Sequence, residues 1–295
     1  MRSLSVSLDA VILAVTEDTP RILLVSRDEG LGLPAGPLDV DADETLTLGL
    51  KRLVSDQTGV DVTYVEQLYT FGDRSRSSSA RTRDLAIGYV ALTDEATTIE
   101  GARWTDIYEL FPWEDHRSGP PTIIPDLIDP GLQRWSAGDG DREARGRLDF
   151  GIGAGWDPIR VLDRYELLFE AGMVSEATAE APAATGRPLV RDHRRIAATA
   201  LGRLRGKLTY RPVIFEVLPE LFTLTELQTT VEAIVGIGLH KQNFRRIVDR
   251  GDLVEPTGEV TTSTGGRPAE LFRFRSDVVT QRPRPGFPLP RPRNL

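Results

Sequence analysis

Runs of branched apolar residues separated by turn-forming residues occupy the first hundred positions of the chain. The runs at 4–16 and 21–26 are rich in Val, Ile and Leu and predict two strands. The intervening Glu17–Pro20 is typical of a hairpin turn. Two more strands are expected at 60–70 and 85–92.

A helix is predicted between these two pairs of strands, from Asp41 to Gln57. We expect Asp41 and Glu44 to cap its first turn and Gly59 to end it in a left-handed conformation. Its apolar positions recur at helical spacing: Leu46, Leu50, Leu53 and Val54. The pattern predicts a mixed α/β domain over 1–150.

The middle of the chain changes character from about Gly101, where prolines, glycines and helical spacing replace the strand pattern. A helix is predicted from Asp157 to Glu170, with Pro158 in its first turn. Ser175–Pro188 is rich in Ala, Thr and Pro and is interpreted as a linker. Residues 151–190 are therefore expected to form a helical connector, for which the sequence suggests no function.

Three helices are predicted in the C-terminal third. The first spans Asp192–Leu208, and the second opens with a Thr223/Glu226 capping box and runs to Val235. Gly236–Gly238 then ends this second helix, and a third helix follows at His240–Arg250. Two helices joined by a glycine turn indicate a helix-turn-helix.

The outer face of the third helix carries groups that can read DNA. Phe244, Ile247 and Val248 should face the core. The opposite face is shared by Gln242, Arg245, Arg246 and Asp249. Guanidinium and amide groups suit the base edges of a major groove.

A predicted hairpin completes this module. Its strands are expected at 253–255 and 269–274, and the loop between them ends in Arg267, as in a wing that touches phosphates. We predict a winged helix over 191–276 and a disordered tail over 277–295. The residues expected to bind DNA are Thr223, Thr225, Lys241, Gln242, Asn243, Arg245, Arg246 and Arg267.

Charge is divided unevenly along the chain. The net charge is −8, but residues 1–190 hold 18 basic against 33 acidic residues, whereas 191–275 hold 14 against 10. A basic end on an acidic body is typical of a DNA-facing module. The chain has no cysteine, no apolar run of about 18 residues and no secretory signal pattern, which favours the cytoplasm.

Four blocks resemble the NrtR-type Nudix-related transcriptional regulators: Leu68–Arg74, Phe222–Gln228, Lys241–Arg246 and Gly265–Ala269. The resemblance covers both domains. It implies a Nudix-like α/β/α sandwich used as a sensor and followed by a winged helix. It also implies a dimeric repressor of NAD metabolism genes that responds to ADP-ribose or a related nucleotide.

A working Nudix hydrolase carries the box G-x5-E-x7-R-E-U-x-E-E-x-G-U, whose carboxylates hold Mg²⁺ against a diphosphate. Aligned on Gly59, the chain supplies Glu44 and Arg52. Leu53 replaces the first Glu of the R-E pair, Asp56 and Gln57 replace the E-E pair, and Gly36 lies two residues too far from Glu44. We therefore expect no catalytic residues, no resident metal and no cofactor.

An anionic nucleotide effector is the ligand expected in this domain, because arginines cluster near 74–83 in an otherwise acidic half and guanidinium groups bind phosphates. A charged hairpin loop without a ligand is the alternative. The residues expected to contact the effector are Phe71, Asp73, Arg74, Arg76 and Arg83.

The sequence as a whole predicts a dimeric regulator that binds a palindromic operator. Two alternatives stay open at this point. One is a Mg²⁺-dependent hydrolase of ADP-ribose or a related nucleoside diphosphate derivative. The other is an interaction protein whose winged helix binds another protein.

Overall fold

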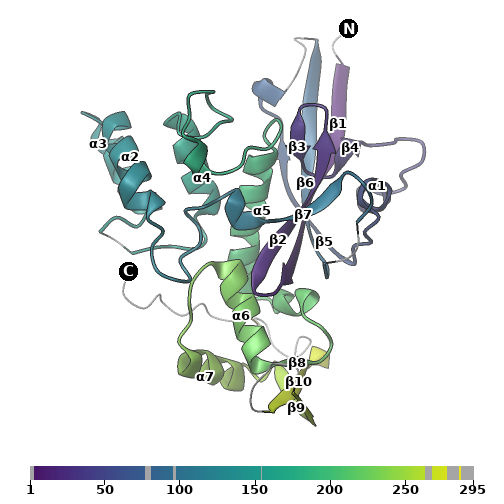
Figure 1. The fold of residues 1–295 in the computed structure, drawn as a ribbon. Coiled ribbons are helices and arrows are strands. Elements are labelled where there is room, and N and C mark those ends of the chain that lie inside the picture. Colours follow the sequence, from purple (N-terminus) through teal and green to yellow (C-terminus); the bar gives the residue numbers. More distant parts are fainter. Residues whose placement is uncertain are drawn as a thin grey trace.

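The computed structural model describes residues 3–76, 81–95, 98–153, 155–262, 268–277 and 286. Its N-terminal half is built on one sheet of seven strands (Figure 1). These are β1 (Ser3–Thr16), β2 (Thr19–Arg27), β3 (Gly30–Gly32), β4 (Ala35–Pro37), β5 (Tyr64–Phe71), β6 (Thr82–Leu92) and β7 (Ala102–Asp106). The four strands expected from the apolar runs are all confirmed.

The sheet is mixed, with the order β3-β2-β1-β6-β5, while β4 pairs with β1 and β7 with β2. β1 and β6 run parallel in continuous register from Ser3 opposite Thr82 to Leu13 opposite Leu92. β7 lies in a stretch expected to be helical and loop-rich. Its five residues alternate too briefly to predict a strand, and it forms because β2 offers it an antiparallel edge.

The predicted helix after β4 is shorter than expected and is α1 (Leu46–Thr58). Thr45, not Asp41, is its N-cap, and the Thr45 hydroxyl accepts a hydrogen bond from the Leu48 amide at 3.1 Å. The acidic residues before it form a loop instead, in which the Asp39 carboxylate accepts from the amides of Asp41 and Ala42. Gly59 ends the helix with φ of 71°, as predicted.

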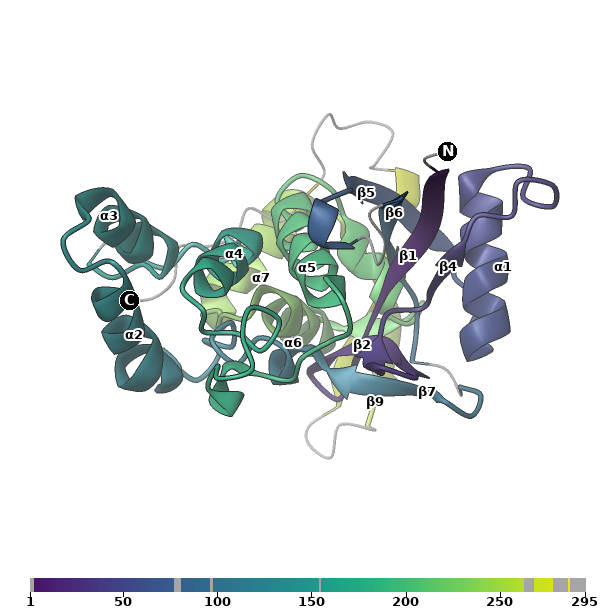
Figure 2. The same cartoon turned by 90° about the horizontal axis from the view of Figure 1, so that it is seen from above.

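The sheet lies between two layers of helix (Figure 2). α1 covers one face, where Leu50 and Val54 pack on Leu8 and Ile12. The other face is covered by α5 (His193–Leu208), and the core on that side includes Ile196. This is the α/β/α sandwich expected of a Nudix-like domain. The helix that completes it comes from the region predicted to open the winged helix.

Three further helices are α2 (Asp129–Trp135), α3 (Gly140–Asp149) and α4 (Val161–Glu170). α4 lies beside α5, and α2 and α3 lie on the far side of α4 (Figure 1). α4 begins four residues later than predicted, because Arg160–Val161 follows a turn around Pro158 and no side chain caps the helix start. The stretch interpreted as a linker is held in place. The Glu176 carboxylate accepts hydrogen bonds from the Leu189 amide and from Arg194 at 3.1 Å each.

The C-terminal module is a winged helix. It contains β8 (Phe222–Thr223), α6 (Leu224–Val235), α7 (Lys241–Gly251), β9 (Val254–Thr261) and β10 (Ala269–Phe274), with the strand order β8-β10-β9. The Thr223/Glu226 capping box and the left-handed Gly236 that ends α6 are confirmed. The proline-rich tail lies outside the described residues apart from Asp277 and Gly286.

No helix in the described ranges is long and apolar enough to cross a membrane.

A buried ion cluster joins the two halves of the molecule. The Glu114 side chain is fully buried and accepts hydrogen bonds from Arg164 at 2.5 and 2.9 Å and from Arg205 at 2.5 Å. Although burial alone would raise the pKa of Glu114, the two guanidinium groups hold it below its ordinary value. Both arginine side chains are themselves inaccessible to solvent. One carboxylate therefore faces two buried guanidinium groups, which also donate to the backbone carbonyls of Asp149, Asp157, Pro158 and Ile234.

His116, beside this cluster, makes stability depend on pH. Burial, opposed only in part by Glu114, lowers its pKa from 6.5 to about 4. The unfolded chain therefore binds a proton that the folded chain does not between these values, and stability is lost as pH falls from 6.5 towards 4. The loss for one proton is about 1.4 kcal/mol per pH unit.

We expect His116→Asn to flatten the pH dependence of the unfolding free energy over this window, by up to about 3 kcal/mol at its acid end. Urea unfolding at a series of pH values measures it. His193 also makes the unfolding free energy fall at low pH, in the wild type and in the variant alike, because burial lowers its pKa to about 3. The difference between the two curves thus isolates His116, and parallel curves would contradict the assignment.

Candidate functional site

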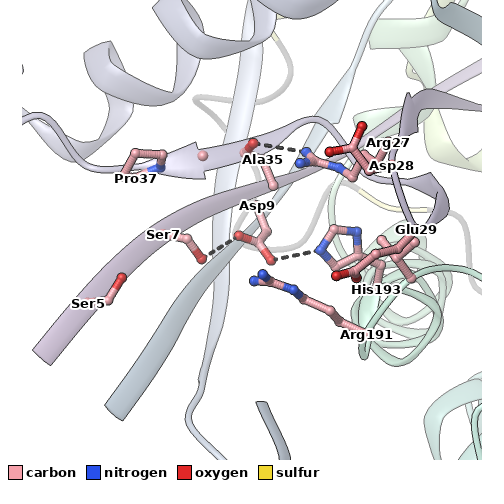
Figure 3. A pocket seen from close by; sticks show the side chains of 12 residues that line it. Ser5, Ser7, Asp9, Arg27, Asp28, Glu29, Ala35, Pro37, Arg191 and His193 are labelled. Atoms are coloured by element: carbon pink, nitrogen blue, oxygen red, sulfur yellow. Dashed lines mark hydrogen bonds and ion pairs between the residues drawn. The ribbon is translucent and has the colours of Figure 1, made fainter. Parts of the chain in front are cut away.

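A cavity of about 380 Å³ opens between the sheet and the segment that leads into α5 (Figure 3). One wall comes from β1, β4 and the β2–β3 turn, and the other from residues 190–193. The lining residues are Ser5, Ser7, Asp9, Arg27, Asp28, Glu29, Ala35, Gly36, Pro37, Val190, Arg191 and His193.

Asp9 is the buried acidic group of this cavity. It interrupts the apolar run of β1 and is 1 % exposed. The Ser7 hydroxyl donates to one carboxylate oxygen at 2.7 Å, and the Arg76 guanidinium lies 3.4 Å from the other. Burial raises the pKa of Asp9, while these contacts oppose the rise. A strand position that would ordinarily be apolar thus anchors a polar network.

His193, the first residue of α5, faces Asp9 with its imidazole Nε2 3.6 Å from the carboxylate. Its Nδ1 accepts a hydrogen bond from the Leu33 amide at 2.9 Å, which places the ring proton on Nε2. Burial first, and then the charges of Arg27, Arg76 and Arg191, lower the pKa of His193 to about 3. The ring is therefore neutral at physiological pH and links α5 to the sheet.

Arg191 is the exposed basic group of the cavity. Its backbone has φ of 53°, a conformation that L-residues other than glycine rarely adopt. Figure 3 shows its side chain directed from the α5 side towards Asp9. Among the residues that the structure describes, it has no hydrogen-bond or ion-pair partner. An anion entering the cavity would therefore meet a guanidinium group that is not already paired.

Arg27, at the end of β2, adds a second guanidinium group on the opposite wall. It donates to the carbonyls of Leu33 and Ala35 at 2.7 and 2.9 Å. Its Nε is buried without a partner among the described residues, and burial lowers the pKa of the group. Asp28 and Glu29 also line the cavity, so its charge is mixed.

The residues aligned with the Nudix box have structural contacts. Leu53 is buried, and a Cβ at Gly36 would lie 2.6 Å from its Cδ1. The Gln57 amide donates to the Ala35 carbonyl at 3.0 Å and accepts from the Ala35 amide at 3.2 Å. Together they hold α1 against β4.

The charged box residues lie on the outer side of α1. Arg52 pairs with Asp43 at 2.9 Å and with Asp56 at 3.6 Å, and Glu44 is exposed before the helix. No group of three or more metal-ligating side chains occurs in the described part of the chain. Of the five box positions, Gly36 is the one that lines the cavity.

The five residues predicted to contact an effector are not gathered in one place. Phe71 is buried in the core, and Arg74 and Arg83 are exposed. Asp73 and Arg76 line a second cavity of about 450 Å³, between the 3₁₀ turn after β5, α4 and the start of α5. Arg76 is buried there and pairs with both Asp9 and Asp192.

The sequence analysis missed Asp9, Arg27, Arg191 and His193. A carboxylate inside the apolar run of β1 is the one signal that could have singled out Asp9. Nothing local marks the other three, because 160 positions separate Leu33 from the histidine that accepts its amide hydrogen bond.

The second candidate site is the outer face of α7. Lys241, Gln242, Asn243 and Arg246 are exposed there, and Phe244 and Val248 are buried against α6. The Arg245 guanidinium donates to the Thr225 hydroxyl at 3.2 Å, and Arg246 donates to the Asn243 side chain at 2.6 Å. The predicted basic face therefore exists as one surface.

Two predicted DNA contacts differ from the rest. Thr223 is 2 % exposed, and its hydroxyl accepts a hydrogen bond from the Glu226 amide as the cap of α6. Arg267, at the predicted wing tip, lies outside the described residues. The remaining predicted residue, Thr225, is exposed at the start of α6 beside Arg245.

The chain resembles known proteins over both domains. Residues 214–274 match the NrtR DNA-binding winged helix domain family. The ADPR responsive transcriptional repressor NtrR of Acinetobacter baylyi is 23 % identical over 273 residues, which cover 91 % of this chain and 81 % of that protein.

Solved structures have the same fold. The Shewanella oneidensis NrtR complexed with a 27mer DNA is 24 % identical, with a TM-score of 0.57, covering 93 % of this chain and 95 % of that one. A MutT/nudix family protein from Enterococcus faecalis is 17 % identical, with a TM-score of 0.57, covering 93 % and 88 %. The C-terminal module is therefore an NrtR-type winged helix, and the whole chain has the NrtR architecture of a Nudix-like domain followed by that winged helix.

Proposed function

We propose that this chain is a DNA-binding transcription regulator, a repressor, whose affinity for its operator is set by a nucleotide-like effector in the Nudix-like domain. The observation that carries the proposal is the outer face of α7. Lys241, Gln242, Asn243 and Arg246 stand exposed on the second helix of a helix-turn-helix, where such residues reach base edges and phosphates.

The effector is placed in the cavity beside Asp9, and ADP-ribose is its proposed identity. Arg191 and Arg27 are suited to a diphosphate, and the Ser5 and Ser7 hydroxyls to sugar or phosphate oxygens. The similarity to a repressor named as ADPR responsive supports the assignment. Arg76, which the sequence analysis expected to contact the effector, acts in this proposal by holding Asp9 and Asp192.

The Nudix-like domain is proposed to bind its ligand without hydrolysing it. Leu53 offers no oxygen to a cation, and Gln57 uses its amide to hold β4. Mg²⁺ requires several oxygen ligands and a diphosphate to bridge. At the positions that would supply these oxygen ligands, Leu53 packs against Gly36 and Arg52 pairs with Asp43.

The proposal includes a dimer in the cytoplasm that binds a palindromic operator near NAD or nucleotide-related genes. Two recognition helices related by a two-fold axis read half-sites about 34–36 Å apart. The proposed domains are 1–150 for the Nudix-like domain, 151–190 for the connector, 191–276 for the winged helix and 277–295 for a disordered tail. α5 would then belong in sequence to the winged helix while packing on the sheet.

Replacing Arg245 and Arg246 with Ala is expected to abolish specific operator binding while leaving the fold intact. Each guanidinium that reads a base or phosphate contributes about 1–3 kcal/mol, so affinity should fall by a factor of at least about 30. Fluorescence anisotropy with a labelled operator duplex measures the loss, and circular dichroism checks the fold.

The matched control is Arg142→Ala with Arg147→Ala on α3, which removes the same charge at exposed positions far from α7 (Figure 1). It should leave affinity nearly unchanged. Unchanged operator affinity in the α7 variant would assign DNA reading to another surface. Affinity that is insensitive to salt would favour a protein partner, because DNA binding releases counterions.

Saturating ADP-ribose is expected to change the operator Kd, by a factor of about 5–150 for a typical coupled pair of sites. Anisotropy titrations with and without the nucleotide measure this factor. The same protein incubated with ADP-ribose and Mg²⁺ should release no AMP beyond a protein-free control. Mg²⁺-dependent turnover would instead support the hydrolase alternative.

A further inference from the structure

The end of α6 and the turn that follows it are held by groups from the segment after β7 and from α5. α6 ends at Val235, and the carbonyls of a last helical turn have no partners within the helix. The Tyr108 hydroxyl donates to the Ala233 carbonyl at 2.6 Å, and the His116 amide donates to the Gly236 carbonyl at 2.7 Å. Both donors belong to the segment that follows β7.

Arg205 of α5 is the central contact of this turn. Its Nε donates to the Ile234 carbonyl at 2.9 Å, and one terminal nitrogen donates to Glu114 at 2.5 Å and to the Pro158 carbonyl at 3.0 Å. The Arg205 side chain is 0 % exposed. It therefore ties α5, the connector and the end of α6 together without access to water.

The turn is packed closely around Gly236. Its φ is 74°, and a Cβ there would overlap the Glu114 carbonyl and lie 2.7 Å from the Arg205 guanidinium. Only Ile237–His240 separates Gly236 from α7. The position of α7 is consequently tied to the position of Arg205.

The other end of the same helix contacts the cavity. Asp192, the residue before α5, pairs with Arg76, which in turn contacts Asp9. His193 faces Asp9 and accepts the Leu33 amide hydrogen bond. α5 has 16 residues, and Arg205 in its last turn lies about 18 Å along the helix axis from His193.

We propose that α5 is the coupling element of the protein, and that Arg205 is the positioning residue through which occupancy of the Asp9 cavity changes the placement of α7. This rests on the proposed function. An anionic ligand that engages Arg191 alters the contacts of the adjacent Asp192 and His193 with the sheet. α5 moves as a rigid helix, and Arg205 carries the end of α6 with it.

Such coupling requires that the ligand bind one arrangement of α5 better than another. The fully buried contacts of Arg205 make a partial displacement costly, because any lost hydrogen bond would leave a charged group unsatisfied away from water. The turn must therefore follow the helix rather than detach from it.

The test compares two variants in the coupling contacts with one control on the same helix. Arg205→Lys keeps the charge but cannot make the forked set of hydrogen bonds, and Tyr108→Phe removes only the hydroxyl that contacts the Ala233 carbonyl. Arg203→Lys is the control, since Arg203 lies on the outer side of α5 and pairs with Glu66. Circular dichroism confirms folding, and Tyr108→Phe serves if Arg205→Lys does not fold.

The measured quantity is the ratio of operator Kd values with and without saturating ADP-ribose, together with the Kd of ADP-ribose alone. We expect Arg205→Lys to lower this ratio at least about fivefold towards 1, Tyr108→Phe to lower it in part, and Arg203→Lys to leave it unchanged. ADP-ribose should bind all four proteins in the absence of DNA with similar affinity, because none of these residues lines the cavity.

Two results would contradict different claims. A wild-type chain that binds neither operator nor ADP-ribose contradicts the proposed function. A responsive wild type whose Arg205→Lys and Tyr108→Phe variants keep the full ratio overturns only the coupling role of α5.

Discussion

The buried contacts of Glu114 are the constraint on which the arrangement of the two domains depends. A carboxylate with no exposed surface is stable only where opposite charges and hydrogen bonds replace its water. Here Arg164 from α4 and Arg205 from α5 supply both. The Arg164 guanidinium also lies over the Trp156 ring at 3.8 Å from its centroid. Removing Glu114 would leave two guanidinium groups buried without a counter-charge, so its carboxylate holds α4 and α5 together.

This requirement explains why α5 has contacts on every side. A helix on the surface of a domain needs one apolar stripe, but α5 buries twelve residues, including His193, Arg194 and Arg205. It packs on the sheet through Ile196, on α4 and on the start of the winged helix. The helix that completes the Nudix-like sandwich is thus also the base of the DNA-binding module.

In the Nudix-like half, the side chains aligned with the Nudix box hold α1 against the sheet. Leu53 fills space against Gly36, and Gln57 joins α1 to β4 through two hydrogen bonds with the Ala35 backbone. Leu53 and Gln57, which offer few oxygen ligands to a metal, thus stabilise the contact between α1 and β4. The cavity beside them keeps its polar lining because Asp9, His193 and Arg76 satisfy one another.

Short-range patterns in the sequence by themselves determined the strands β1, β2, β5 and β6, the helices α6 and α7 and the capping box at Thr223. Each of these depends on neighbours within one turn or one strand. The basic face of α7 followed from the same spacing, because residues three and four apart share a helix face. The tertiary structure alone decided the existence of β7 and the position of α5 on the sheet. It also decided the cavity, since Asp9 and His193 meet only after β1 and α5 have packed. Residues so far apart in the chain leave no periodic signal, because burial and charge pairing, rather than local conformation, bring them together.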